Sequence, residues 1–217
     1  MVSSAALRAT MIDSQLRTND VNDARLLDAV AEIPRERFVP SEKKSLAYMS
    51  EPIETAKGRY LLDPRSFGKL MQAATIGPDD VVLVAGGGNG YMAAVAAKLA
   101  STVVALECEA DMAAAAEQAF ADLGLDNIAV IKGPLEKGRG DQGPYDVILI
   151  NGGVEEVPPV LFDQLKEGGR LAAIVVNGPA GKGHLYVKAA TGLSRRIVFD
   201  ATVPLLPGFT KAREFTF

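Results

Sequence analysis

The sequence has only one cysteine and one histidine among 217 residues. A single cysteine, Cys108, excludes an intrachain disulfide framework and any zinc site built from several cysteines. A single histidine, His184, excludes clustered-histidine metal sites and leaves a Ser-His-Asp triad dependent on one residue. We therefore expect no bound metal.

The chain also lacks an excess of positive charge, because 23 Lys and Arg face 27 Asp and Glu, a net charge of −4. An acidic chain lacks the electrostatic footprint of a general nucleic-acid binder, so we expect no nucleic-acid partner. The start, MVSSAALRAT, has no long apolar segment, so we expect no signal peptide and a cytoplasmic location. The 48% hydrophobic composition excludes disorder.

One apolar run, residues 81–106, is long enough to span a bilayer. Four glycines in five residues and Lys98 interrupt it, and each glycine costs a helix about 1 kcal/mol. A strand, a glycine turn and a helix explain the same run better, so we expect no membrane association.

The first forty residues show helical spacing over 6–16 and 22–33, with Asp20 or Asn22 as the expected cap of the second helix. Residues 38–65 lose periodicity and contain three prolines, which predicts an irregular segment long enough to suggest a function. We expect residues 1–65 to form a helical extension with a pocket-covering segment, and residues 66–217 to form an α/β domain.

From residue 66 the pattern alternates helices with buried apolar strands. Helices are expected over 66–75, 90–99, 110–123 and 158–165, and strands over 81–85, 102–106, 127–131, 145–150 and 170–176, with two more β-like stretches in 195–217 near Pro204 and Pro207. This order predicts an α/β, doubly wound, mostly parallel sheet of about seven strands that is covered on both sides.

The most informative segment is Val81–Tyr91, where a buried strand leads through a glycine turn into a helix. In such folds a ligand lies at the carboxyl ends of the strands. Glu107 ends the next strand, 21 positions after Gly86, where an acidic side chain can accept hydrogen bonds from a ribose diol.

The spacing of the turn restricts the nucleotide. Gly86, Gly88 and Gly90 form G-x-G-x-G, and Tyr91 occupies the position that the dinucleotide pattern reserves for a small residue. No phosphate-cradling P-loop is present. A sugar with a charged tail that lacks phosphate fits better, which points to S-adenosylmethionine; a glycine turn without a ligand stays an alternative.

Motifs spread over nearly the whole chain resemble the protein-L-isoaspartate O-methyltransferase family. They are Met11-Ile12-Asp13-Ser14-Gln15-Leu16, Ile33-Pro34-Arg35-Glu36-Arg37-Phe38-Val39-Pro40, Ala47-Tyr48, Gly58, Pro64, Gly90-Tyr91, Leu106-Glu107, Pro144-Tyr145-Asp146 and Gln164-Leu165-Lys166-Glu167-Gly168-Gly169-Arg170-Leu171. The resemblance implies a Rossmann-like, seven-stranded methyltransferase sheet with an N-terminal helical part. It also implies S-adenosylmethionine as cofactor, and isoaspartyl carboxylates of damaged peptides or proteins as methyl acceptors.

The same resemblance implies which residues form the site. Gly86, Gly87, Gly88, Asn89 and Gly90 would line the methionine part and Glu107 the ribose, Cys108, Pro134 and Leu135 would flank the adenine, and Asn151 and Gly152 would border the reacting end. No catalytic residue is assigned, because the position of the family serine is Leu62.

The chain departs from the family at positions that the resemblance assigns to cofactor or substrate contacts. Val84 stands where members carry an acid, Pro134 replaces an aspartate near the adenine, and Ser50 replaces another aspartate. Each lost cofactor contact costs about 1–3 kcal/mol, so we expect weakened cofactor binding. A carboxylate acceptor has an unperturbed pKa of about 4, so it is already ionised at neutral pH and needs no general base. The serine that Leu62 replaces would therefore hold the substrate in place, and its loss removes a substrate clamp rather than a proton acceptor. Two alternatives are a catalytically impaired relative that acts as a binding module, and a methyltransferase with a different acceptor.

Other residues give weaker signals. We expect Asp63 and Glu54 to be solvated, His184 to lie in a turn, and Cys108 to be a small buried apolar group. Arg35, Glu36 and Arg37 are expected to pair with each other at the surface. The sequence does not indicate an oligomeric state.

Overall fold

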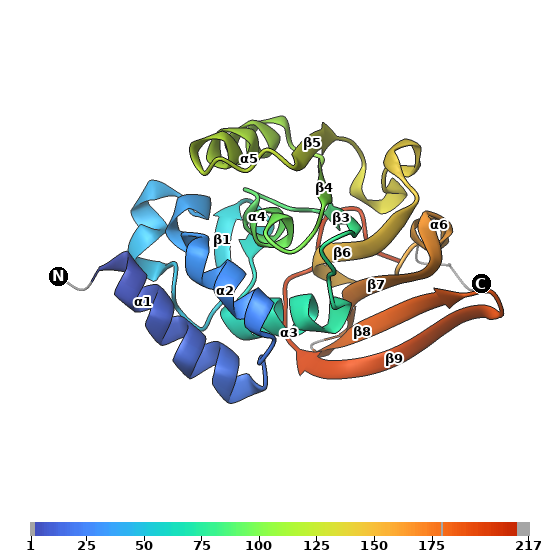
Figure 1. Cartoon of the computed structure of the whole chain (residues 1–217), viewed down its shortest axis with the longest axis horizontal. Coiled ribbons are helices and arrows are strands. Elements are labelled where there is room, and N and C mark those ends of the chain that lie inside the picture. Colours follow the sequence, from blue (N-terminus) through green and yellow to red (C-terminus); the bar gives the residue numbers. More distant parts are fainter. Residues whose placement is uncertain (1–2, 179, 212–217) are drawn as a thin grey trace, which may run out of the picture.

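The computed structural model describes residues 3–178 and 180–211 and contains one large sheet flanked by helices (Figure 1). The helices are α1 Ser4–Met11, α2 Ala24–Glu32, α3 Pro64–Ala74, α4 Tyr91–Ala97, α5 Ala110–Asp122 and α6 Pro159–Asp163. The strands are β1 Ile53–Ala56, β2 Arg59–Leu61, β3 Val81–Ala85, β4 Thr102–Glu107, β5 Ile128–Lys132, β6 Tyr145–Val154, β7 Leu165–Asn177, β8 Ala180–Ala189 and β9 Gly192–Ala201.

In the described residues the large sheet has seven strands in the order β5-β4-β3-β6-β7-β8-β9. Strands β5 to β7 pair in parallel, whereas β8 and β9 are antiparallel to their neighbours. The predicted α/β, mostly parallel, seven-stranded sheet is therefore confirmed.

Alternate side chains of the central strands pack into two separate hydrophobic cores, one on each face of the sheet. Val82 and Val84 of β3 pack with the helices of the first face, from α2 to α5, whereas Leu83 packs with Leu161 of α6 and with Leu206 on the second face. Successive side chains of a strand point to opposite faces, so a sheet covered on both sides requires continuous apolar strands. The predicted cover on both faces is present.

Both N-terminal helices begin two residues away from their predicted positions. Helix α1 continues as a π-helix over Ile12–Leu16. The N-cap of α2 is Asp23, whose carboxylate accepts a hydrogen bond from Leu26 N at 2.9 Å. The expectation of Asp20 or Asn22 was wrong, because Asp20 adopts the left-handed conformation that ends the preceding turn. The helices before residue 66 share the first core, and the division at 65/66 stays a prediction.

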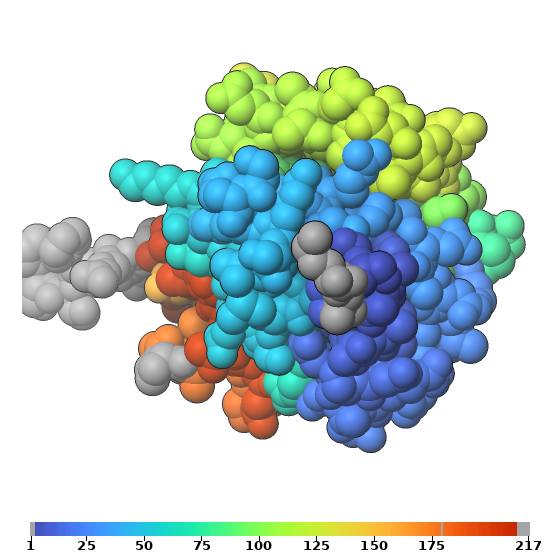
Figure 2. Space-filling view, turned by 90° about the vertical axis from the view of Figure 1, so that its left-hand side faces the viewer, coloured from blue at the N-terminus to red at the C-terminus, as the bar shows by residue number. Residues whose placement is uncertain are grey.

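The segment expected to be irregular contains more structure than its pattern indicates. Two 3-10 turns, Arg35–Phe38 and Ser41–Leu46, precede the β1–β2 hairpin, which forms a small sheet of its own. Asp63 is buried and caps α3 by accepting from Ser66 N at 2.9 Å, so the expectation of a solvated Asp63 was wrong. Figure 2 shows this blue-to-cyan N-terminal segment covering one end of the molecule.

The last two strands were predicted too far along the chain. They occupy 180–189 and 192–201, and the described segment that follows has a bridge between Leu205 and Gly153 and a turn near Pro207. His184 therefore lies in β8 rather than in a turn, and it is buried beside Tyr186. The part of the predicted β-like stretch at 212–217 lies outside the described residues.

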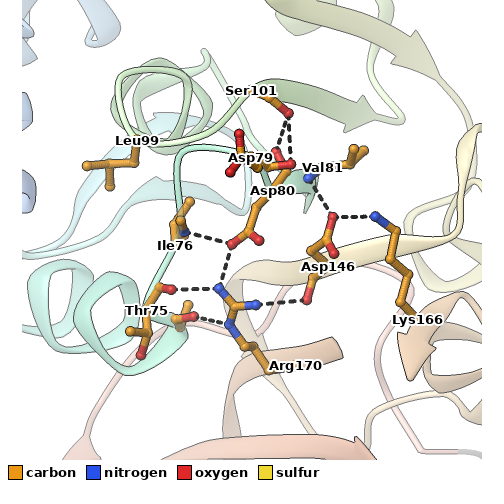
Figure 3. A network of polar contacts seen from close by, with 12 residues as sticks. Thr75, Ile76, Asp79, Asp80, Val81, Leu99, Ser101, Asp146, Lys166 and Arg170 are labelled. Carbon is orange, nitrogen blue, oxygen red and sulfur yellow. Dashed lines mark hydrogen bonds and ion pairs between the residues drawn. The ribbon is translucent and has the colours of Figure 1, made fainter. Parts of the chain in front are cut away.

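A polar network fixes the amino-terminal edge of the parallel strands (Figure 3). Arg170 of β7 binds the carboxylate of Asp80 at 2.5 Å and the carbonyl oxygens of Ala74 and Thr75 at 2.6 Å. Asp146 of β6 accepts from Val81 N at 2.8 Å and from the Lys166 ammonium at 2.7 Å. These contacts tie β3, β6 and β7 together at the edge opposite the candidate site.

Over residues 3–178 and 180–211, no helix has the length and apolar character needed to cross a membrane. The apolar run 81–106 forms β3, α4 and β4, as its glycines predicted.

Candidate functional site

The glycine turn lies at the carboxyl end of β3, next to the start of α4. Gly86, Gly88 and Gly90 all have positive φ angles, of 73°, 57° and 103°. Side chains are strained in this region, and a Cβ at Gly90 would lie 2.6 Å from the ring of Phe120. The glycines therefore let the backbone reverse sharply and let α5 pack closely against it.

Glu107 ends β4 directly beside this turn. Its Oε2 accepts a hydrogen bond from Gly88 N at 3.0 Å, and its Oε1 accepts from Cys108 N at 2.8 Å and Glu109 N at 3.1 Å. Strand and turn thus meet as the sequence pattern indicated, although 19 positions separate Glu107 from Gly88. The carboxylate and the turn form one local unit.

The sequence did not indicate the main partner of Glu107, which is Arg59 from the β1–β2 hairpin. The guanidinium forms two contacts with the carboxylate, Nη1 to Oε1 at 2.5 Å and Nη2 to Oε2 at 2.6 Å. Arg59 is 3% exposed and Glu107 is 2% exposed. Burial alone would raise the pKa of Glu107, but the hydrogen bonds and charge of Arg59 and two backbone N–H donors hold that pKa below its usual value.

Cys108 lies at the same place, with its Sγ 3.6 Å from Nη1 of Arg59. The expected small buried apolar group is only partly buried, and it packs against the second core. Burial and the neighbouring Glu107 carboxylate raise the pKa of the thiol. A raised pKa disfavours the thiolate, which slows the reaction of Cys108 with electrophiles.

The residues predicted around the adenine and the reacting end approach the same edge of the sheet. Gly133 N donates to the Glu107 carbonyl at 3.0 Å, which brings the following Pro134 and Leu135 beside β4. Leu135 is buried against the second core. Asn151 donates from Nδ2 to the Gly86 carbonyl at 2.9 Å. These contacts join the ends of β3, β4, β5 and β6.

Hydrocarbon fills much of the remaining space near the turn. A Cβ at Gly86 would lie 2.6 Å from Leu206, and one at Gly152 would lie 3.0 Å from the same side chain. A cavity of about 10 Å³ remains, lined by Phe38, Thr55, Tyr60, Leu61, Gly87, Gly88, Asn89, Tyr91 and Asn151. Ligand pockets usually measure about 300–1,000 Å³, so this cavity by itself is too small for a nucleoside while the hairpin lies against the turn.

Leu62 follows the hairpin with its side chain buried in the first core. Its carbonyl accepts a hydrogen bond from Nη2 of Arg35, while Nε of Arg35 donates to the Ala47 carbonyl at 2.7 Å. The Arg35 guanidinium is fully buried and lies 4.9 Å from the centre of the Tyr91 ring. Burial lowers the pKa of Arg35, with Tyr91 opposing the effect. Arg35 thus joins three segments.

Surface pairing within the Arg35-Glu36-Arg37 triplet was therefore wrongly predicted. Glu36 accepts from the Tyr48 hydroxyl, and Arg37 pairs with Asp122 of α5 at 3.6 Å. Glu54 is exposed, as expected, and its carboxylate accepts from Gly58 N at 3.1 Å. Ser50 lines a separate polar hollow of about 170 Å³ together with Asp63 and Arg65.

Within the described part of the chain, no group of three His, Cys, Asp or Glu side chains could hold a metal ion. The site therefore consists of a glycine turn and a carboxylate at the carboxyl edge of a parallel sheet. This combination is typical of α/β domains that bind nucleosides.

Comparisons with known proteins identify the family. The sequence model of the family described as Protein-L-isoaspartate(D-aspartate) O-methyltransferase matches residues 7–196. The chain is 40% identical over 210 residues to a protein-L-isoaspartate O-methyltransferase of Koribacter versatilis (strain Ellin345), covering 95% of this chain and 94% of that protein. It is 38% identical over 179 residues to one of Synechococcus sp. (strain JA-2-3B'a(2-13)), covering 82% and 73%. The chain belongs to this family.

Solved structures agree on the fold. A protein-L-isoaspartate O-methyltransferase superposes with a TM-score of 0.80 at 24% identity, covering 96% of this chain and 67% of that one. A putative family member from Plasmodium falciparum, solved in complex with S-adenosyl-L-homocysteine, gives 0.79 at 18% identity, covering 93% and 98%. The predicted methyltransferase fold is confirmed.

Proposed function

We propose that this protein is an S-adenosylmethionine-dependent methyltransferase that methylates isoaspartyl carboxylates in damaged peptides and proteins. Membership of the family supports the reaction class. The observation that carries the proposal for this chain is the meeting of Glu107 with Gly88 at the carboxyl edge of the sheet. In such folds an acidic side chain at this place accepts hydrogen bonds from a ribose diol, which supports a cofactor role for Glu107.

The residues at this edge of the sheet fit a nucleoside that carries no phosphate. Glu107 would accept from the ribose hydroxyls, Gly86 to Gly90 would line the methionine part, Cys108, Pro134 and Leu135 would flank the adenine, and Asn151 and Gly152 would border the reacting end. When bound, S-adenosylmethionine supplies an electrophilic methyl group on a sulfonium. The fit requires the Arg59 side chain to leave Glu107, since that carboxylate already accepts from Arg59 and from three backbone N–H groups.

The protein's own residues align the acceptor and exclude water. An isoaspartyl carboxylate is ionised near neutral pH, so no residue has to remove a proton from it. The chain's residues would then contribute by holding the acceptor carboxylate beside the bound cofactor and by keeping water out. Leu62 offers no hydroxyl to an acceptor, and its side chain is buried in the first core.

A methyl-transfer assay tests this function. Purified protein is incubated with S-adenosylmethionine carrying a labelled methyl group, and with two peptides that differ only in an isoaspartyl or an aspartyl linkage. We expect base-labile methyl ester on the isoaspartyl peptide alone. Equal labelling of both peptides, or none on either, would contradict the proposal. Glu107→Ala is the matched negative control, because it removes the ribose acceptor.

A further inference from the structure

The β1–β2 hairpin brings a positive side chain to the carboxylate that the proposed cofactor needs. Arg59 lies in β2, 48 positions before Glu107, yet both Nη atoms contact the two carboxylate oxygens. Three backbone N–H groups occupy the same oxygens. Few acceptor sites are left for two ribose hydroxyls while Arg59 stays in place.

The hairpin forms a sheet of its own, and its Ile53 and Leu61 side chains pack into the first core. It is a two-stranded sheet separate from the main one, and such a hairpin alone is marginally stable. Its turn contains Gly58 at φ 70° with open space around it. Lys43 donates to the Glu54 carbonyl at 2.7 Å at an exposed position. The Arg59–Glu107 pair is therefore the main polar contact between the hairpin and the carboxyl edge of β4.

We propose that Arg59 is an internal competitor of the cofactor, which closes the nucleoside site by binding Glu107 until the β1–β2 hairpin opens. This inference rests on the function proposed above. Opening separates the ion pair and enlarges the cavity of about 10 Å³ beneath Tyr60 and Leu61. A cofactor that binds only the open form has its affinity reduced by the fraction of molecules that are open.

Calorimetric titration with S-adenosylhomocysteine tests the competition. Arg59→Met keeps the length and apolar stem of the side chain but removes the charge. Lys57→Met is the matched control, because it removes a positive charge from the exposed turn of the same hairpin. We expect Arg59→Met to bind at least tenfold more tightly than the unaltered protein, and Lys57→Met to bind equally. Arg59→Lys, with one point charge and no fork, should be intermediate.

The single cysteine gives an independent readout of opening. Cys108 Sγ lies 3.6 Å from Arg59, so its rate of reaction with a disulfide reagent reports whether the hairpin covers it. The charge of Arg59 lowers the pKa of this thiol, so removing Arg59 by itself would slow the reaction. Faster labelling in Arg59→Met, at least tenfold, would therefore come from opening. Thermal melting confirms that each variant is folded.

The possible results separate the two proposals. Equal affinities of the unaltered protein and Arg59→Met, or weaker binding by the variant, would overturn the competition while leaving the methyltransferase function intact. Unchanged labelling of Cys108 in a folded Arg59→Met variant would also overturn it. Absence of binding by every variant at millimolar S-adenosylhomocysteine would overturn both the function and the competition.

Discussion

Arg35 donates a hydrogen bond to the carbonyl of Leu62, the residue that we expect at the family's serine position. The same guanidinium binds the Ala47 carbonyl and lies over the Tyr91 ring at the start of α4. One buried cation thus links the N-terminal 3-10 turns, the end of the hairpin and the first helix after the glycine turn.

We expect Arg35→Met to lower the free energy of unfolding by about 2–5 kcal/mol, because two buried carbonyls lose their donor. Urea denaturation measures the effect. Arg37→Met, two positions on, removes only a half-exposed pair with Asp122 and should cost less than about 1 kcal/mol. Equal losses in the two variants would show that the buried hydrogen bonds of Arg35 stabilise the fold no more than the half-exposed ion pair of Arg37 does.

Gly90→Ala should destabilise the protein by about 2–4 kcal/mol, since it adds strain at φ 103° and a Cβ 2.6 Å from Phe120. Gly124→Ala is the control, because Gly124 also has a positive φ, of 64°, but open space around it. That variant should lose only about 1–2 kcal/mol. If thermal melting gave Gly90→Ala the smaller loss, close packing of α5 on the turn would be refuted.

Leu62→Ser combined with Ser50→Asp tests the substrate clamp. We expect the pair to raise the turnover of an isoaspartyl peptide. Because the Leu62 side chain is 1% exposed, we also expect a loss of about 2–5 kcal/mol in stability from the cavity. Leu46→Ser, at an exposed site, should change neither quantity. An unchanged turnover in a folded double variant would count against the clamp.

Asp146 predicts a pH dependence of stability. Burial alone would raise its pKa, but the Lys166 ammonium and the Val81 N–H hold it below its usual value. Its contribution to stability is therefore full above the unfolded pKa of about 4 and is lost as pH falls through the lower folded value. Asp146→Asn should flatten the loss of stability between about pH 4 and 2. Asp141→Asn is the control, because it removes a carboxylate from an exposed pair with Arg139. A flattened profile in the control alone would reverse this assignment.

Much of the fold from residue 64 onward could be predicted, because strands buried on both faces leave continuous apolar runs such as 81–85 and 147–150. The last two strands could not be placed. The first six residues of β9, from Gly192 to Ile197, are exposed, so no alternation marks them. The hairpin was missed because its strands have only four and three residues and are followed closely by Pro64.

The part of the site that could be predicted is formed by the ends of two strands that follow one another in the sequence. The glycine turn and Glu107 follow two adjacent parallel strands, so their ends must meet. Arg59 carries no such signal. It lies 48 positions before Glu107 in a segment without periodicity. The sequence alone does not distinguish a buried arginine from a solvated one. The burial of Arg35 and the capping role of Asp63 could not be predicted either, because both residues flank or lie in the segment without periodicity and charged residues are usually solvated.

The central claim is that Glu107 holds the ribose of the cofactor once Arg59 has left it. A crystal structure of the protein with S-adenosylhomocysteine tests this most directly. We predict both ribose hydroxyls within hydrogen-bond distance of the Glu107 carboxylate, with the Arg59 guanidinium out of contact. A nucleoside bound away from Glu107, or bound there while the Arg59–Glu107 pair stays intact, would contradict the account.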